Sequence, residues 1–201
     1  MPFYHQKNIS DRHRLALWKI TESKDILLEL ANQLPYNLNL PEVNSESRIK
    51  QWLATRLLLQ QLLPGEQITY TEKGKPLLSN GKHISISHTT EFAAVLVSDH
   101  ACGIDIEKQD QKIERVKHKF LSTEDIEKLQ TTEELTVYWS AKEALYKYYG
   151  EKEVLFIEHL FVDQFSTESP SFKGKINLAG FTAEIAMKWE RIDDSILVYT
   201  L

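Results

Sequence analysis

Two carboxylates stand close together in the stretch Gly103–Glu107, where they could share a cation. Ile104 and Ile106 alternate with Asp105 and Glu107, which is the period of a β-strand with one apolar and one polar face. Alternate side chains on one face of a strand lie about 6–7 Å apart, close enough to bind one hard cation together. A strand that ends in Asp-x-Glu is also common at a solvated sheet edge. This stretch alone therefore leaves both readings open.

A second stretch, Trp139–Lys147, places a carboxylate and a lysine on one face of a predicted helix. Trp139, Glu143 and Lys147 follow one another at intervals of four residues, so their side chains line up along the helix. Alone, such a Glu–Lys pair is usually a surface ion pair worth a few tenths of a kcal/mol. Combined with the carboxylates of the strand, it suits Mg²⁺ bound beside a phosphate ester.

Together the two stretches resemble the central motifs of the 4′-phosphopantetheinyl transferases, Gly-Ile-Asp-Ile-Glu and Trp-Ser-x-Lys-Glu-Ala-x-x-Lys. The resemblance implies a reaction in which the 4′-phosphopantetheine arm of coenzyme A passes to a serine of an apo acyl or peptidyl carrier protein. Adenosine 3′,5′-bisphosphate is released. In this family Asp105, Glu107 and Glu143 would hold Mg²⁺, or Mn²⁺ in its place. Glu143 would be the general base, directly or through a water, and Lys147 and Lys142 would bind the phosphates.

The first half of the chain carries further elements of this resemblance. Arg48 and Arg56 lie eight residues apart in the predicted helix that starts at Ser45, and the family uses an arginine of this helix to hold the phosphates of coenzyme A. A Gly-Lys-Pro turn and a Ser-His pair resemble elements that contact the adenine and phosphate end of that molecule. Solvated arginines, a plain turn and a hydrogen-bonded histidine are the alternative readings. The candidate ligands of coenzyme A in this half are Arg56, Lys75, Pro76, Ser87 and His88.

Two other classes of function remain open. One is a metal-dependent phosphoesterase that acts on coenzyme A or a nucleotide, with the same carboxylates and with water as the nucleophile. The other is a non-catalytic module that binds a nucleotide or a carrier protein. The role of Glu124 is also open, because a glutamate in the first turn of a helix either stabilises the helix dipole or lies near the cation.

Composition limits the partners and the compartment. The chain of 201 residues has a net charge of −5, so it offers no general attraction to nucleic acid. An acidic carrier protein would have to meet a local basic patch, and the run Lys108–Lys119 is the densest candidate. No apolar run is long enough to span a membrane, the N-terminus has no apolar signal core, and Cys102 is the single cysteine. We expect a cytoplasmic protein with no membrane partner.

The order of predicted elements is typical of an α+β protein. Strands and helices precede residue 100, and the metal strand, the catalytic helix Glu134–Tyr149 and an antiparallel meander follow it. The resemblance implies two similar α+β halves related by a pseudo-twofold axis, with the active site between them, and a monomer in solution. We assign coenzyme A nucleotide binding to residues 1–100 and the metal and catalytic helix to residues 101–201. The predicted meander strands are Phe156–Phe165, Ser171–Lys175, Phe181–Trp189 and Ile196–Leu201.

Overall fold

The structure, a computed structural model, describes residues 4–166 and 169–201. The chain divides into two compact units, Met1–His100 (unit 1) and Ala101–Leu201 (unit 2). Each unit combines α-helices with an antiparallel sheet, which confirms the predicted α+β class. Among the described residues, none of the helices has both the length and the apolar character that crossing a bilayer requires. A pseudo-twofold relation between the units remains a prediction.

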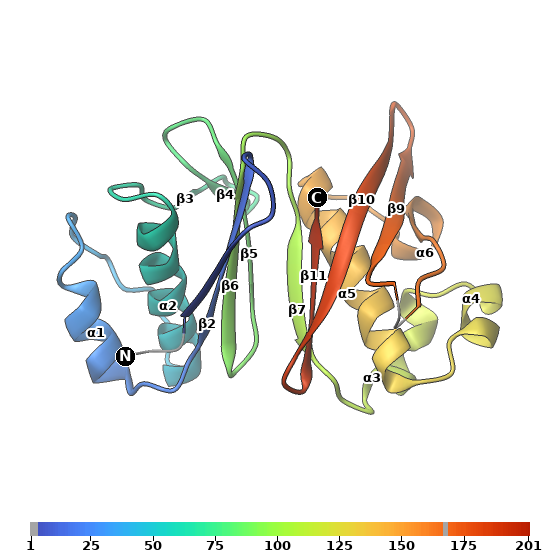
Figure 1. Ribbon diagram of the computed structural model, residues 1–201, viewed down its shortest axis with the longest axis horizontal. Coiled ribbons are helices and arrows are strands. Elements are labelled where there is room, and N and C mark those ends of the chain that lie inside the picture. The colour runs from blue at the N-terminus through green and yellow to red at the C-terminus, as the bar shows by residue number, and fades with distance from the viewer. Residues whose placement is uncertain (1–3, 167–168) are drawn as a thin grey trace. The chain divides into compact units, whose positions relative to one another are not determined.

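Unit 1 is a four-stranded antiparallel sheet with two helices on one of its faces (Figure 1). The strands run in the order β1-β2-β6-β5, and a separate two-stranded pair, β3 and β4, lies in the connection that leads to β5. The elements are β1 (Tyr4–Asn8), β2 (His13–Lys19), α1 (Lys24–Ala31), α2 (Glu46–Leu62), β3 (Thr69–Tyr70), β4 (Pro76–Leu77), β5 (His83–His88) and β6 (Phe92–Ser98).

Helix α2 is the central support of unit 1. The Ser45 side chain caps its N-terminus by accepting a hydrogen bond from the Arg48 N–H, as the sequence predicts. Leu53, Leu58 and Leu59 are fully buried in the core that α2 forms with the sheet. Most of the α2 surface is covered, and the buried residues include one charged side chain, that of Arg56, which lies between Leu53 and Leu58 in the sequence.

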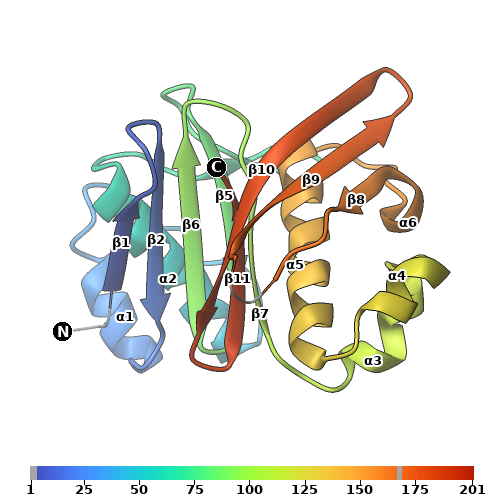
Figure 2. The same cartoon turned by 45° about the vertical axis from the view of Figure 1, so that its right-hand side comes forward.

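Unit 2 is a five-stranded antiparallel sheet packed against one long helix, α5 (Figure 2). The strand order is β7-β11-β10-β9-β8, so β7, which carries the predicted metal ligands Asp105 and Glu107, lies at an edge. The elements are β7 (Ile104–Lys108), α3 (Ile113–Val116), the 3₁₀ helix η1 (Lys117–Lys119), α4 (Thr123–Lys128), α5 (Thr132–Tyr149), α6 (Phe156–His159), β8 (Leu160–Val162), β9 (Ser171–Leu178), β10 (Phe181–Ile192) and β11 (Ser195–Thr200).

The capping residues fix the boundaries of α5. A capping box between Thr131 and Glu134 begins the helix two residues before the predicted start, and Gly150 ends it in the left-handed conformation. The helix predicted over Glu134–Tyr149 is therefore confirmed, with a small shift at its N-terminus.

One predicted strand is wrong. Residues 156–165 do not form a continuous strand, because α6 precedes the short strand β8. The ring Nδ1 of His159 accepts a hydrogen bond from the Leu155 N–H and closes this helical turn. That bond is a local contact of one side chain, which the apolar pattern of the segment does not reveal.

Candidate functional site

Strand β7 and helix α5 approach each other unusually closely at Gly103. A Cβ atom at this position would lie 1.9 Å from the Ala144 carbonyl oxygen and 3.1 Å from the Tyr148 backbone nitrogen. No side chain fits there without moving backbone atoms of α5. The glycine of the Gly-Ile-Asp-Ile-Glu stretch therefore allows the strand that carries Asp105 to lie directly against the helix that carries Glu143 and Lys147.

A buried ion pair joins the strand to the helix. The Lys147 Nζ donates to Asp105 Oδ1 at 2.7 Å and to the Ile104 carbonyl oxygen at 3.0 Å. The Asp105 side chain is only 4% exposed and that of Lys147 is 26% exposed. Removing one partner of such a pair leaves a buried charge uncompensated, which is far more costly than losing a surface pair.

The carboxylate face of β7, rather than its isoleucine face, packs against α5. The Trp139 Nε1 donates to Glu107 Oε1 at 3.3 Å, and Lys147 binds Asp105 as described. Ile104 and Ile106 are fully buried but are not part of the apolar core that α5 forms with the sheet. The strand thus has the predicted alternation of apolar and acidic residues, and Asp105 on its acidic face is buried as well as the two isoleucines.

Glu143 lies between these groups without a partner of its own. It makes no hydrogen bond or ion pair within residues 4–166 and 169–201, and its side chain is partly buried. Burial and the negative charges of Asp105 and Glu107 raise the pKa of Glu143 from its ordinary 4.5 to about 7, against the opposing effect of Lys147. Burial and Asp105 likewise raise the pKa of Glu107. We call Asp105, Glu107, Glu143 and Lys147 the carboxylate site.

The donor atoms of the carboxylate site are of the kind that a hard cation prefers. Its three carboxylates supply only oxygen ligands, and their mutual repulsion, seen in the raised pKa values of Glu107 and Glu143, would be relieved by a divalent cation. In the described part of the chain, however, no three His, Cys, Asp or Glu side chains converge closely enough to bind one metal ion together. Cation binding would therefore require side-chain movement, and the predicted metal ligands remain a prediction.

Lys142 and Glu124 are the two other residues of unit 2 for which the sequence suggests a role near the phosphates or the cation. Lys142 is 1% exposed, and its Nζ donates to the carbonyl oxygens of Phe120 and Phe156, each at 2.7 Å. Burial lowers its pKa to about 8. The structure thus shows Lys142 bound to two backbone carbonyl groups, and its predicted contact with phosphate remains a prediction. The Glu124 side chain is 77% exposed and pairs with Lys128 at 2.6 Å, away from the carboxylate site.

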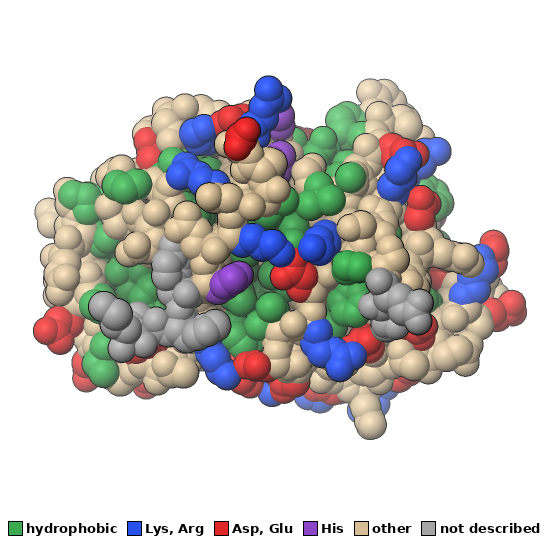
Figure 3. All heavy atoms as spheres, in the orientation of Figure 1, with side chains coloured by type: hydrophobic (Ala, Val, Ile, Leu, Met, Phe, Trp, Pro, Cys, Tyr) green, Lys and Arg blue, Asp and Glu red, His purple; other side chains and the backbone are tan. Residues whose placement is uncertain are grey.

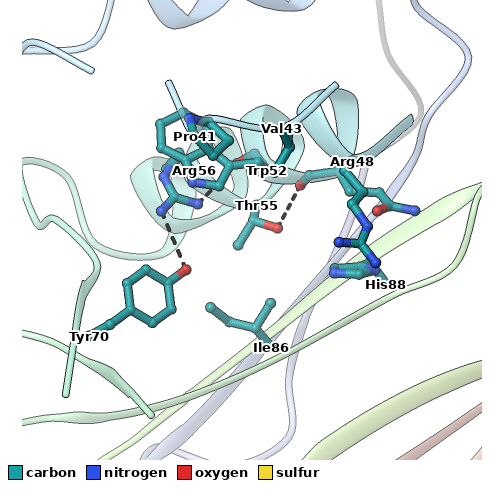
Figure 4. Close-up of a pocket in the computed structure, with 10 residues that line it drawn as sticks. Pro41, Val43, Arg48, Trp52, Thr55, Arg56, Tyr70, Ile86 and His88 are labelled. Carbon is teal, nitrogen blue, oxygen red and sulfur yellow. Dashed lines mark hydrogen bonds between the residues drawn. The ribbon is translucent and has the colours of Figure 1, made fainter. Parts of the chain in front are cut away.

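Unit 1 has a pocket of about 420 Å³, and Arg56, a candidate ligand of coenzyme A, lines it (Figure 4). Three of the side chains that line the pocket can carry positive charge, namely Arg48, Arg56 and His88. None of the lining side chains is acidic. In the view of Figure 4, Arg56 and Tyr70 lie at one end of the pocket and Arg48 and His88 at the other. We call it the arginine pocket, and it is lined by Pro41, Val43, Arg48, Gln51, Trp52, Thr55, Arg56, Tyr70, Ile86 and His88.

The structure brings together only part of the predicted coenzyme A set. Arg56 and His88 line the arginine pocket, whereas Lys75, Pro76 and Ser87 do not. Lys75 belongs to the turn between β3 and β4, where its N–H donates to the Thr71 hydroxyl at 3.1 Å. Its charge acts on His83, whose pKa it lowers after the larger effect of burial. The roles of these three residues in binding coenzyme A remain predictions.

Sequence reasoning missed two aromatic residues of this pocket. Neither Trp52 of α2 nor Tyr70 of β3 is among the candidate ligands that the sequence predicts. The spacing of Trp52 and Arg56, one helical turn apart, is the signal that could have identified the first of them. No comparable signal links Tyr70 to the helix, because their contact depends on the fold.

Comparison with known proteins bears on unit 2 above all. The sequence profile of the 4′-phosphopantetheinyl transferase superfamily matches residues 101–194, which include the whole carboxylate site. The chain is also similar to 4′-phosphopantetheinyl transferase gsp of Aneurinibacillus migulanus, with 26% identity over 136 residues. That similarity covers 63% of this chain and 57% of the relative, so the chain spans little more than half the length of the curated protein that it matches. The similarity of this chain to the 4′-phosphopantetheinyl transferase superfamily therefore includes the segment 101–194, which carries the carboxylate site.

Proposed function

We propose that the protein transfers the 4′-phosphopantetheine arm of coenzyme A to a serine of an apo acyl or peptidyl carrier protein and releases adenosine 3′,5′-bisphosphate. The observation that carries this proposal is the placement of Glu143, which has no hydrogen-bond or ion-pair partner among the described residues, on α5 beside Asp105 and Glu107 of β7. A carboxylate that no described group already binds can accept a proton, as activation of a serine hydroxyl requires. The proposal includes the pseudo-dimeric type of this superfamily, acting as a cytoplasmic monomer.

Each residue of the carboxylate site has a role in this reaction. Asp105, Glu107 and Glu143 would hold Mg²⁺ or Mn²⁺, which polarises a pyrophosphate and offsets the charge on its leaving group. Glu143 would take the proton of the serine hydroxyl, directly or through a water. Lys147, held by Asp105 and by the Ile104 carbonyl, keeps one positive charge beside the carboxylates, where a phosphate oxygen would need it.

The arginine pocket supplies the second part of the proposal. Arg56 is 5% exposed and forms no ion pair with any described carboxylate, so a buried positive charge is available there. Arg48 and His88 line the same pocket. Such a site favours an anionic ligand because a phosphate would compensate the cost of burying the guanidinium. We assign it to the nucleotide end of coenzyme A, which carries a phosphate.

The surface around α3 and η1 is the proposed docking site for the carrier protein. Positive and negative side chains are interspersed on the face drawn in Figure 3, so attraction to an acidic partner must be local. In the run Lys108–Lys119, Lys112 already faces Asp110 at 3.5 Å. Arg115 and Lys119 are exposed and have no ion pair within the described residues. Their charge would remain available for an acidic carrier.

Mass spectrometry of an apo carrier protein incubated with coenzyme A and Mg²⁺ tests the proposed reaction. Transfer adds the phosphopantetheine mass to the carrier and produces adenosine 3′,5′-bisphosphate. A phosphoesterase would instead consume coenzyme A without a carrier and leave the carrier mass unchanged. A non-catalytic module would bind coenzyme A or the carrier and change neither. Either of these last two outcomes would overturn the proposed transfer.

Charge reversal at Arg115 and Lys119 tests the docking surface. The double change to Glu should raise the KM for the carrier at low salt and reduce its salt dependence, because exposed charges act mainly on encounter and are screened by ions. The KM for coenzyme A should stay the same. Lys152→Glu, at an exposed lysine of unit 2 outside the basic run, is the matched control. If the control raises the carrier KM as much as the double change does, docking does not depend on this surface.

A further inference from the structure

Arg56 lies in a setting of aromatic residues and not of acids. The centre of its guanidinium lies 3.5 Å from the centroid of the Trp52 ring and 6.0 Å from that of Tyr70. Its charge also lowers the pKa of Tyr36, against the larger effect of burial on that phenol. A stacked guanidinium over an indole ring is a stable cation–π arrangement. The aromatic residues therefore hold the cation without neutralising it.

Hydrogen bonds fix the orientation of the same guanidinium. Its Nη1 donates to the Trp52 carbonyl oxygen at 3.2 Å and its Nη2 donates to the Tyr70 hydroxyl at 3.3 Å (Figure 4). Both acceptors are neutral. The ring contact sets the plane of the fork and the two bonds set its rotation in that plane, and guanidinium N–H groups beyond these two bonds remain for a ligand.

An arginine held in this way suits a phosphate monoester. The planar fork matches two oxygens of one phosphate group, and a guanidinium that is already oriented loses little side-chain entropy when the ligand binds. The pocket wall holds further positive side chains, Arg48 and His88, and no carboxylate that would repel an anion. In the proposed reaction the pyrophosphate of coenzyme A is bound at the carboxylate site, which leaves its terminal phosphate monoester for Arg56.

We propose that Trp52 and Tyr70 are positioning residues that hold Arg56 as a pre-oriented fork for the phosphate monoester of the ligand. This inference rests on the proposed function for the identity of that ligand, coenzyme A. It adds that the affinity for the monoester depends on two neutral aromatic side chains that act through the arginine. A lysine at position 56 could not replace the arginine, because its ammonium group has neither the plane nor the fork.

Calorimetric titration with coenzyme A and with 3′-dephospho-coenzyme A tests the inference. The wild type should bind coenzyme A more tightly than the dephosphorylated compound. Trp52→Leu should weaken binding of coenzyme A by about 3- to 30-fold, the range for a lost cation–π contact. Tyr70→Phe should weaken it by about 3- to 10-fold, as expected for a lost hydrogen bond to a charged group that acts indirectly. Both changes should weaken binding of 3′-dephospho-coenzyme A much less than binding of coenzyme A, because the dephosphorylated compound lacks the phosphate monoester.

Three further variants separate positioning from general damage. Trp52→Phe keeps an aromatic ring under the guanidinium and should recover most of the affinity for coenzyme A. Trp18→Leu is the matched control, since Trp18 is a buried tryptophan of unit 1 outside the arginine pocket. It should lower stability without changing the ratio of the two affinities. On an Arg56→Gln background, Trp52→Leu and Tyr70→Phe should have no additional effect on coenzyme A binding.

The outcomes for this inference and for the proposed function are distinct. Equal affinity of the wild type for the two compounds, or failure to bind either, would overturn the inference. So would an unchanged affinity ratio in Trp52→Leu and Tyr70→Phe, or equal effects of both changes in the presence and absence of Arg56. Transfer to a carrier protein is measured separately, so discrimination that depends on these residues would support the inference even if no transfer occurred.

Discussion

Replacing Glu143 by Gln should stabilise the metal-free protein and at the same time abolish its activity. Burial and the charges of Asp105 and Glu107 raise the pKa of Glu143 from 4.5 to about 7. Each pKa unit corresponds to about 1.4 kcal/mol, so the ionised carboxylate costs the folded protein roughly 3 kcal/mol at pH 8. Glutamine keeps the shape of the side chain without its charge. The free energy of unfolding of Glu143→Gln should therefore exceed that of the wild type by up to about 3 kcal/mol.

The pH dependence of this difference follows from the direction of the pKa shift. Because the folded-state pKa lies above the unfolded-state value, the folded protein binds more protons between pH 4.5 and about 7. The stability contributed by protonated Glu143 is complete below pH 4.5 and is lost as the pH rises through 7. The Glu143→Gln variant does not lose this stability as the pH rises, because the glutamine side chain does not ionise. The advantage of the variant should thus be large at pH 8 and small at pH 5.

Urea denaturation in the presence of a chelator, at pH 5 and at pH 8, measures both quantities. Glu127→Gln, a change at an exposed glutamate of α4, serves as the control and should leave stability unchanged at both pH values. Transfer by Glu143→Gln should fall by at least about 10²-fold, since the change removes the proposed base and a proposed cation ligand. Equal unfolding free energies of variant and wild type at pH 8, or a difference that does not depend on pH, would refute the electrostatic reasoning.

Substitutions at Gly103, Lys147 and Lys142, and treatment with a chelator, provide further tests of the carboxylate site and of the residues around it. Gly103→Ala should destabilise unit 2 by about 1–3 kcal/mol or more, because its Cβ would meet the α5 backbone, and thermal melting would detect the loss. Lys147→Ala should cost about 3–5 kcal/mol in urea denaturation by removing the ammonium group that pairs with buried Asp105, and adding Asp105→Asn should recover much of this stability without restoring transfer. Lys142→Met should lower the melting temperature and leave the KM for coenzyme A unchanged, whereas a higher KM would support the original phosphate role. A chelator should abolish transfer, and Mg²⁺ should raise the melting temperature of the wild type but not of Glu143→Gln.

Local periodicity explains which parts of the carboxylate site the sequence could predict. The alternation around Asp105 defines a strand, and the four-residue spacing of Glu143 and Lys147 defines a helical face. Neither pattern states which face of the strand meets the helix. That choice follows from the contact at Gly103 and from the Lys147 ion pair, both of which join segments distant in the sequence.

Lys142 and Arg56 show what a motif cannot supply. Lys142 precedes Glu143 by one residue, so it lies roughly 100° around the helix and points to two carbonyl groups in connecting segments that have no periodic pattern. The setting of Arg56 likewise depends on Tyr70, which comes from the two-residue strand β3. In both cases the partner is a single group whose position only the tertiary fold determines.

The two candidate sites carry charge of opposite sign, and this is the physical reason why the proposed function assigns a phosphate-bearing part of coenzyme A to each of them. At the carboxylate site, burial and then repulsion between carboxylates raise the pKa of Glu143 and Glu107, so this site would gain stability from a cation. At the arginine pocket, burial lowers the pKa of Arg56, so that site would gain stability from an anion. A phosphate ester that arrives with a divalent cation satisfies the first site, and a second phosphate on the same molecule satisfies the other. Coenzyme A has both groups, whereas a simple phosphomonoester would relieve only one of the two sites.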